Sequence, residues 1–197
     1  KFLSEINGFE ESSRSMFFDN HRNLWISHGY RGLFRVNLTE ELDSVTSVRL
    51  YKGEFGLPQQ LPYNIQVLNN EMYISTHSGV LRYNSSNESF SSAFEVNKLF
   101  ANKGFIDKLQ QDRSGNIWYF TNNYMGILRL LEDGTYIDIT SPFSNVNEIL
   151  LPAFQNIFIY DPINIFIGSQ KGLIHYAPNI IKDYSTSDRV FIKETVF

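Results

Sequence analysis

The sequence of 197 residues contains no cysteine, which excludes disulfide bonds, thiolate metal sites and cysteine nucleophiles. Charged residues make up only 19% of the chain and the formal net charge is −4, so no basic face for a nucleic-acid backbone is indicated. No apolar run approaches the roughly 18 residues of a membrane-spanning helix. The sequence starts at Lys1 without a methionine or a signal peptide, and we interpret it as a processed chain or a segment of a longer protein.

Aromatic residues, in contrast, are abundant: 2 Trp, 11 Tyr and 17 Phe make up 15% of the chain. A disordered segment lacks the apolar side chains that offset the entropy cost of ordering, so this composition indicates a folded domain. At about 150 residues per domain, the length allows one domain or one large β architecture.

Four segments of the sequence repeat the same pattern of an aromatic residue, a glycine and a basic residue. The glycines are 47, 47 and 46 residues apart, and an aromatic residue precedes each glycine by six to eight positions. The repeated aromatic and glycine positions are Trp25, Gly32, Tyr73, Gly79, Trp118, Gly126, Phe166 and Gly172. A period of about 40–50 residues is typical of repeat architectures such as β-propellers.

Each repeat unit predicts short β-strands, because runs of Ile, Leu, Trp, Tyr and Phe are bounded by Asn, Asp, Gly and Ser. Between the first two strands of the third unit, Asp112 and Gly115 have the chemistry of a turn. Four strands in each unit are typical of a propeller blade. We expect strands at 13–19, 23–28, 31–37 and 45–51 in the first unit, and at 105–111, 116–121, 126–131 and 135–140 in the third.

The predicted fold is therefore all-β: a partial β-propeller of about four four-stranded antiparallel blades. Neighbouring blades stack face to face, so we expect the repeated aromatic residues and glycines to be structural anchors of the blades. The expected divisions are 1–12 as the end of a preceding blade or a linker, 13–60, 61–104, 105–148 and 149–186 as four blades, and 187–197 as the start of a following domain.

The repeat resembles that of a known family. The pattern Asp-x-x-Gly-Asn-Ile/Leu-Trp-Ile-Gly-Thr-x-x-Gly-Leu-x-Arg-Tyr of the two-component regulator propeller repeat is similar to residues 112–130 and 23–36. The Gly-His and Trp-Asp pairs of WD repeats and the Gly-Gly pair of kelch repeats are absent. The tail 187–197 resembles the opening strand of the triple-tyrosine sandwich domain, which commonly follows these propellers.

The resemblance implies the extracytoplasmic sensor of a membrane-anchored regulator. Typical members are hybrid sensor histidine kinases of Bacteroidetes that often control polysaccharide use, and others end in DNA-binding regulators. The resemblance therefore implies a periplasmic location, contact with the membrane only through the parent protein, and a fragment of a larger propeller of about seven blades. The sequence has no ATP-binding or phospho-acceptor motif, so we predict that this segment is not an enzyme.

The loops between the second and third strands are the varied part of the repeat. Their aromatic, amide and guanidinium groups suit a polyhydroxylated ligand, which makes an oligosaccharide the expected partner. The alternative is that these are ordinary solvated loop residues. The candidate ligand-binding residues are His28, Tyr30, Arg31, His77, Asn122, Asn123, Tyr124, Gln170 and Lys171.

The sequence predicts no catalytic residues, no cofactor and no metal site. The four histidines form no i, i+4 pair, whereas zinc sites usually have compact ligand spacing. No Gly-x-Ser-x-Gly elbow and no glycine-rich phosphate loop before a helix occurs. Several carboxylates are expected mostly in turns, namely Asp107, Asp112, Glu132 and Asp133.

Three functions remain open from the sequence. The first is a non-catalytic sensor propeller, and the second is a scaffold propeller that mediates protein contacts. The third is a propeller polysaccharide lyase or hydrolase, which predicts carboxylates with perturbed pKa values clustered at one end of the channel. Besides an oligosaccharide, the expected partners are neighbouring blades and the sandwich domain of the parent chain. We also expect self-association through an exposed blade edge, and no direct contact with nucleic acid.

Overall fold

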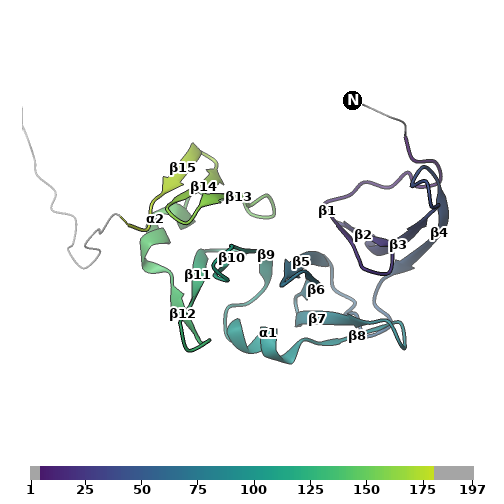
Figure 1. The fold of residues 1–197 in the computed structure, drawn as a ribbon, viewed down its shortest axis with the longest axis horizontal. Helices are drawn as coiled ribbons and strands as arrows, with labels where there is room; N and C mark the ends of the chain where they lie inside the picture. Colours follow the sequence, from purple (N-terminus) through teal and green to yellow (C-terminus); the bar gives the residue numbers. More distant parts are fainter. Residues whose placement is uncertain (1–4, 180–197) are drawn as a thin grey trace, which may run out of the picture.

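The computed structural model describes residues 5–179, which form four antiparallel β-sheets arranged as blades around a shared axis (Figure 1). In each sheet the strands follow one another in sequence order, so every blade is a simple meander. Three blades have four strands, and the fourth has three strands among the described residues. The all-β propeller expected from the repeat is therefore confirmed. The expected sandwich-domain strand at 187–197 lies outside the described residues.

The first strand of each blade lies nearest the centre of the arrangement and the last strand lies toward the outside (Figure 1). The first blade contains β1 (Ser15–Phe18), β2 (Asn23–His28), β3 (Gly32–Leu38) and β4 (Val45–Tyr51). The second contains β5 (Asn64–Leu68), β6 (Glu71–Thr76), β7 (Gly79–Asn84) and β8 (Ser89–Ser92). The third contains β9 (Ile106–Gln111), β10 (Ile117–Thr121), β11 (Met125–Leu130) and β12 (Tyr136–Ile139). The fourth contains β13 (Ile157–Asp161), β14 (Asn164–Ser169) and β15 (Gly172–Tyr176).

The strands predicted for the first and third units agree with these bounds to within two residues. Three short helical segments in the connections between blades were not predicted, because three to six residues carry no helical periodicity. They are α1 (Phe94–Leu99), η1 (Ser141–Phe143) and α2 (Ser144–Asn147). None of the helices within residues 5–179 is long and apolar enough to cross a membrane.

An aspartate turn sets the position of the aromatic anchor in two blades. The Asp19 carboxylate accepts hydrogen bonds from the backbone amides of His21 and Asn23, and from Nε1 of Trp25 at 2.8 Å. Burial raises the pKa of Asp19, but these hydrogen bonds outweigh it and hold the pKa below its ordinary value. Asp112 accepts the equivalent bonds in the third blade, which confirms the predicted turn.

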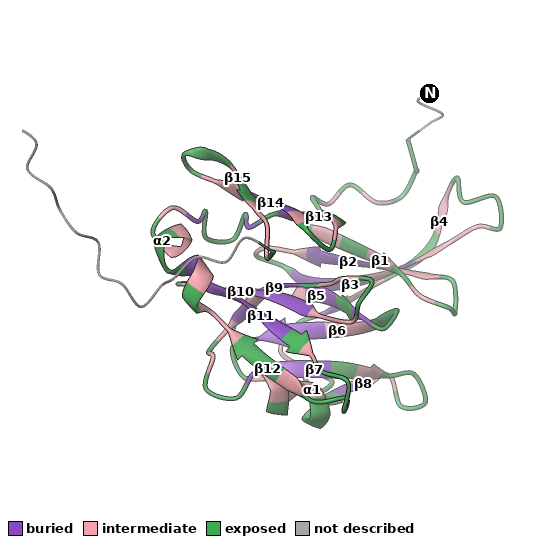
Figure 2. Cartoon of the chain, turned by 60° about the vertical axis from the view of Figure 1, so that its left-hand side comes forward, coloured by how far each residue is buried: buried purple, intermediate pink, exposed green. Residues whose placement is uncertain are grey.

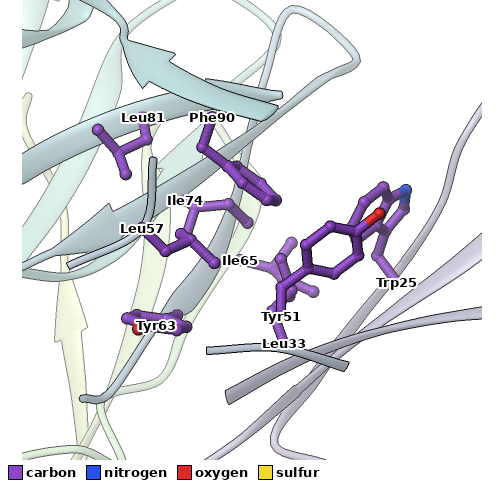
Figure 3. Packing of buried hydrophobic residues seen from close by; sticks show 9 residues of the cluster. All are labelled: Trp25, Leu33, Tyr51, Leu57, Tyr63, Ile65, Ile74, Leu81 and Phe90. Atoms are coloured by element: carbon purple, nitrogen blue, oxygen red, sulfur yellow. The ribbon is translucent and has the colours of Figure 1, made fainter. Parts of the chain in front are cut away.

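Trp25 fills the space between the first two blades. Its side chain is fully buried, and its ring packs against Tyr83 and Phe90 of the second blade at centroid distances of 4.7 and 6.1 Å. Apolar residues of both blades complete this core around it (Figure 3). Buried residues accordingly concentrate on the inner and middle strands of the blades (Figure 2).

Trp118 has the same place between the third and fourth blades, where it contacts Phe143 and Tyr176. The other two repeated aromatic residues are only partly buried. Tyr73 packs at the edge of the core between the second and third blades and donates a hydrogen bond to Glu71. Phe166 stacks on His175 at 5.0 Å, on the face of the fourth blade that points away from the third.

That outer face of the fourth blade is apolar and exposed. Phe158 and Leu173 are 63% and 73% exposed, whereas the face toward the third blade contains the buried Ile165 and Ile167. The contrast follows from the alternation of side chains along strands. One face of this blade is packed and the other has no blade on it among residues 5–179.

Candidate functional site

A polar hollow of about 440 Å³ lies along the inner strands. We call it the channel. Every blade contributes to its lining, from β5, from β9, from the residue before β1 and from the segment before β13. Its hydrogen-bonding and charged side chains include Arg14, Asn64, Gln66, Asp107, Lys108 and Gln155. A concave site with a small number of converging polar groups is typical of ligand recognition.

A second hollow of about 440 Å³ opens at one end of the channel, with which it shares Arg14, Asp107 and Ala153. We call it the mouth. Its wall is largely apolar and aromatic, and His77 stacks on Phe105 with centroids 4.5 Å apart and planes 20° apart. The other side chains of the mouth are those of Tyr30, Leu61, Pro62 and Asn122.

Asp107 lines both hollows and therefore marks their junction. Asp107 belongs to β9, within the strand predicted at 105–111, and so is not one of the carboxylates that lie in turns. The pairing of β9 with β10 shifts register here and skips Asp107 between Ile106 and Lys108. Such a bulge redirects a side chain that regular pairing would place elsewhere. The carboxylate accepts a hydrogen bond from Nε2 of Gln155 at 3.0 Å.

The surroundings disfavour the charged forms of two adjacent residues of β9. Burial raises the pKa of the Asp107 carboxyl, and the hydrogen bond from Gln155 together with the electrostatic effects of Arg14 and His77 offsets only part of this rise. Burial lowers the pKa of the Lys108 ammonium. Perturbed titratable groups that line a hollow indicate a functional site.

Three charged side chains converge on segment 153–156, which leads into β13. The Arg14 guanidinium donates to a backbone carbonyl of this segment at 3.3 Å. The Lys108 ammonium donates to the side-chain oxygen of Asn156 at 3.3 Å. Asp107 accepts its hydrogen bond from the same segment. The segment thereby connects the first, third and fourth blades at the junction of channel and mouth.

Replacing Asp107 with asparagine is expected to increase the free energy of unfolding more at pH 7 than at pH 3. Since the folded-state pKa of Asp107 lies above its unfolded-state value, the ionised carboxylate destabilises the fold at neutral pH. This cost disappears as the pH falls through the folded-state pKa, and the variant lacks the charge at every pH. Urea unfolding of Asp107→Asn and wild-type chains at both pH values measures the effect.

Asp133→Asn is a control of opposite sign. Hydrogen bonds from Thr135 lower the pKa of the exposed Asp133, so its ionised form stabilises the fold above the unfolded-state pKa. That stability is lost as the pH falls through the folded-state pKa. The free energy of unfolding of Asp133→Asn minus that of wild type should therefore be more negative at pH 7 than at pH 3. The same trend in both variants would show that burial of Asp107 is not the cause.

Three of the nine residues predicted to bind a ligand lie together at the mouth. They are Tyr30, His77 and Asn122, from the loops between the second and third strands of three blades. All three are exposed, and Tyr30 is 86% exposed. The mouth is therefore built where the sequence places the varied loops.

The other six predicted residues have local roles within their own blades. The His28 Nδ1 atom accepts hydrogen bonds from the backbone amides of Tyr30 and Arg31, at 3.1 and 3.2 Å, and these bonds shape the loop between β2 and β3. Arg31 forms an ion pair with Glu11. Tyr124 packs against Tyr119 beside the core.

The remaining three also stabilise loops. The backbone amide of Asn123 donates a hydrogen bond to the Thr121 hydroxyl, and the backbone amide of Lys171 donates one to the Ser169 hydroxyl. The Gln170 side chain donates to the carbonyl of Leu150 at 2.8 Å. Of these three residues only Gln170 makes its contact through the side chain, and none of the three lines the mouth.

Sequence reasoning missed most of the channel. Arg14, Gln66, Lys108 and Gln155 received no role from the sequence, although Gln66 and Gln155 are buried. Arg14 and Lys108 lie within the first strands predicted at 13–19 and 105–111, and polar residues there were the available signal, because a strand packed between blades is otherwise apolar. The Gln66 Oε1 atom accepts a hydrogen bond from the backbone amide of Leu109 at 2.7 Å, which joins β5 to β9.

Comparisons with known proteins found similar solved structures, whereas no protein-family model and no curated protein matches the sequence. The extracellular domain of BT4673 from B. thetaiotaomicron, assigned as a one-component system, has a TM-score of 0.52 at 18% identity over 85% of this chain. A second structure of that domain, assigned as a hybrid two-component system, has a TM-score of 0.44 at 16% identity over 84% of this chain. This chain spans 22% and 23% of their lengths. At these identities the first likeness supports the propeller fold alone.

Proposed function

We propose that this chain is a non-catalytic ligand-recognition segment in the periplasmic sensor of a two-component regulator, and that its ligand is an oligosaccharide. The observation that carries the proposal is the aromatic mouth that opens onto a channel lined by all four blades. The similarity in fold to an extracellular domain of a protein assigned as a one-component system supports the sensor role. A ligand at this place contacts several blades at once, so binding can alter their packing and bias a two-state regulator.

The chemistry of the mouth favours a sugar over a compact apolar ligand. Sugar rings present C–H faces that pack on aromatic surfaces, which His77, Phe105 and Tyr30 provide. Their hydroxyl groups need donors and acceptors, which Asn122 and Asp107 provide. The exposed Tyr30 ring requires little rearrangement to meet a ligand.

Calorimetric titration of the 197-residue chain with a panel of neutral and acidic oligosaccharides tests this function. We expect Tyr30→Ala and His77→Ala each to weaken binding of an active glycan roughly tenfold, since stacking contacts contribute about 0.5–1.5 kcal/mol beyond area burial. Tyr160→Ala is the matched control, because Tyr160 is 68% exposed and lies outside both hollows. Absence of heat with every glycan, or equal losses in all three variants, would contradict the proposal.

The scaffold function is the second candidate, and one observation favours it. The exposed apolar face of the fourth blade, with Phe158 and Leu173, suits a protein contact. If the scaffold function holds, these residues mediate binding to a neighbouring domain, and the mouth variants leave that binding unchanged.

The lyase or hydrolase alternative receives little support from the site. Asp107 is the only carboxylate among the described residues that line the channel and mouth. Glycoside hydrolysis generally uses a pair of carboxyl groups on either side of the scissile bond. Release of reducing sugar from a polysaccharide would nevertheless revive this alternative.

A further inference from the structure

The channel contains a cation that has no counter-ion. The Lys108 side chain is half-buried, and its hydrogen bond to Asn156 Oδ1 is long, at 3.3 Å. None of the ion pairs within 4.0 Å among residues 5–179 includes Lys108. The channel therefore contains an ammonium group that is partly removed from water and that no carboxylate neutralises.

Removing a charge from water costs free energy unless an opposite charge or several hydrogen bonds replace the water. Burial indeed lowers the pKa of Lys108, and no charged neighbour counteracts the effect. An anion in the channel would restore the missing interaction. A partly buried charge without a partner that lines a hollow is a candidate contact for an oppositely charged ligand.

Asp107 and Arg14 carry opposite formal charges, which cancel in the net charge of the channel lining. Asp107 interacts electrostatically with Arg14 and His77, while neither Asp107 nor Arg14 belongs to an ion pair within 4.0 Å in the described part of the chain. Asp107 thus faces the mouth with a free acceptor for a hydroxyl group. The net charge left for a ligand to neutralise is the positive charge of Lys108.

We propose that the channel binds an acidic sugar residue, with a uronate carboxylate on the Lys108 ammonium and a ring hydroxyl on the Asp107 carboxylate. This inference rests on the proposed oligosaccharide recognition and narrows the ligand to uronic-acid saccharides. A charge-assisted hydrogen bond is shorter and about twice as strong as a neutral one. The preference for acid over neutral sugar is therefore the measurable property.

The test compares a galacturonate oligomer with its fully methyl-esterified form, which differ in charge and little in shape. Wild type should bind the acid roughly tenfold more tightly than the ester, and added salt should reduce this preference. Lys108→Met should bind both forms with the affinity that wild type has for the ester. Lys98→Met is the control, because Lys98 lies on α1, outside the channel lining, and should keep the preference.

The outcomes separate this inference from the function on which it rests. Equal binding of acid and ester by wild type would overturn the acidic-sugar assignment while leaving oligosaccharide recognition in place. A preference for the acid that survives in Lys108→Met would overturn the role of Lys108. If neither form binds, and no other glycan of the panel binds, the proposed function is overturned as well. Unfolding curves of Lys108→Met establish that the variant is folded in each case.

Discussion

Replacing Trp25 with alanine is expected to lower the free energy of unfolding by about 3–5 kcal/mol, the usual cost of removing a large buried aromatic side chain. The indole has no exposed surface and contacts Tyr83 and Phe90 of the next blade. It also donates to the Asp19 carboxylate, which loses this partner in the variant. Since a domain is stable by only about 5–15 kcal/mol, such a loss is a large part of the total.

Urea unfolding followed by intrinsic fluorescence or circular dichroism measures the loss, with the midpoint as the observable. Tyr30→Ala is the matched control, because Tyr30 is 86% exposed and its removal should change the stability by about 0.5 kcal/mol or less. A loss below about 1 kcal/mol for Trp25→Ala would mean that the first two blades are not held together by this side chain.

Replacing Gly32 with alanine is expected to cost about 2–4 kcal/mol, for two separate reasons. Gly32 has φ of +127°, a conformation that residues with a Cβ atom rarely adopt. A Cβ atom there would lie 2.4 Å from the backbone oxygen of Tyr51. Because that oxygen belongs to strand β4, relief of the clash requires movement of the sheet itself.

Gly172→Ala separates these two costs. Gly172 has the same phase in the repeat and φ of +119°, but a Cβ atom there would meet no atom within 4 Å. This variant therefore bears the backbone strain of about 1–3 kcal/mol without the clash. Thermal or urea unfolding should show a loss that is at least about 1 kcal/mol larger for Gly32→Ala. Equal losses would mean that the contact with Tyr51 has no energetic consequence.

Comparison of Gly32 with Gly126 shows that the same repeated glycine can be required for different physical reasons. At Gly126, the equivalent position of the third blade, φ is not in the left-handed region. A Cβ atom there would instead lie 2.4 Å from the Tyr119 hydroxyl. The repeat therefore preserves a glycine at this phase, while the reason for it depends on the neighbours of each blade.

The blade architecture was determined by the sequence itself, because the interactions that define one blade are local. In the first and third units the aspartate turn, the aromatic anchor and the glycine lie close together in the sequence, from Asp19 to Gly32 and from Asp112 to Gly126, and β-meanders pair neighbouring strands. A period of 47 residues could thus be interpreted without coordinates. The loops between second and third strands, with Tyr30 and His77, followed directly from this assignment.

The channel was decided only by the tertiary structure. Gln155 binds Asp107, and Asn156 binds Lys108, each across 48 residues of sequence, and no local pattern predicts these pairs. They depend on how far each blade rotates about the axis and on a one-residue bulge in β9, which points Asp107 into the hollow. Local periodicity determines which side chains alternate along a strand, whereas the stacking of the blades determines which of them meet at the centre.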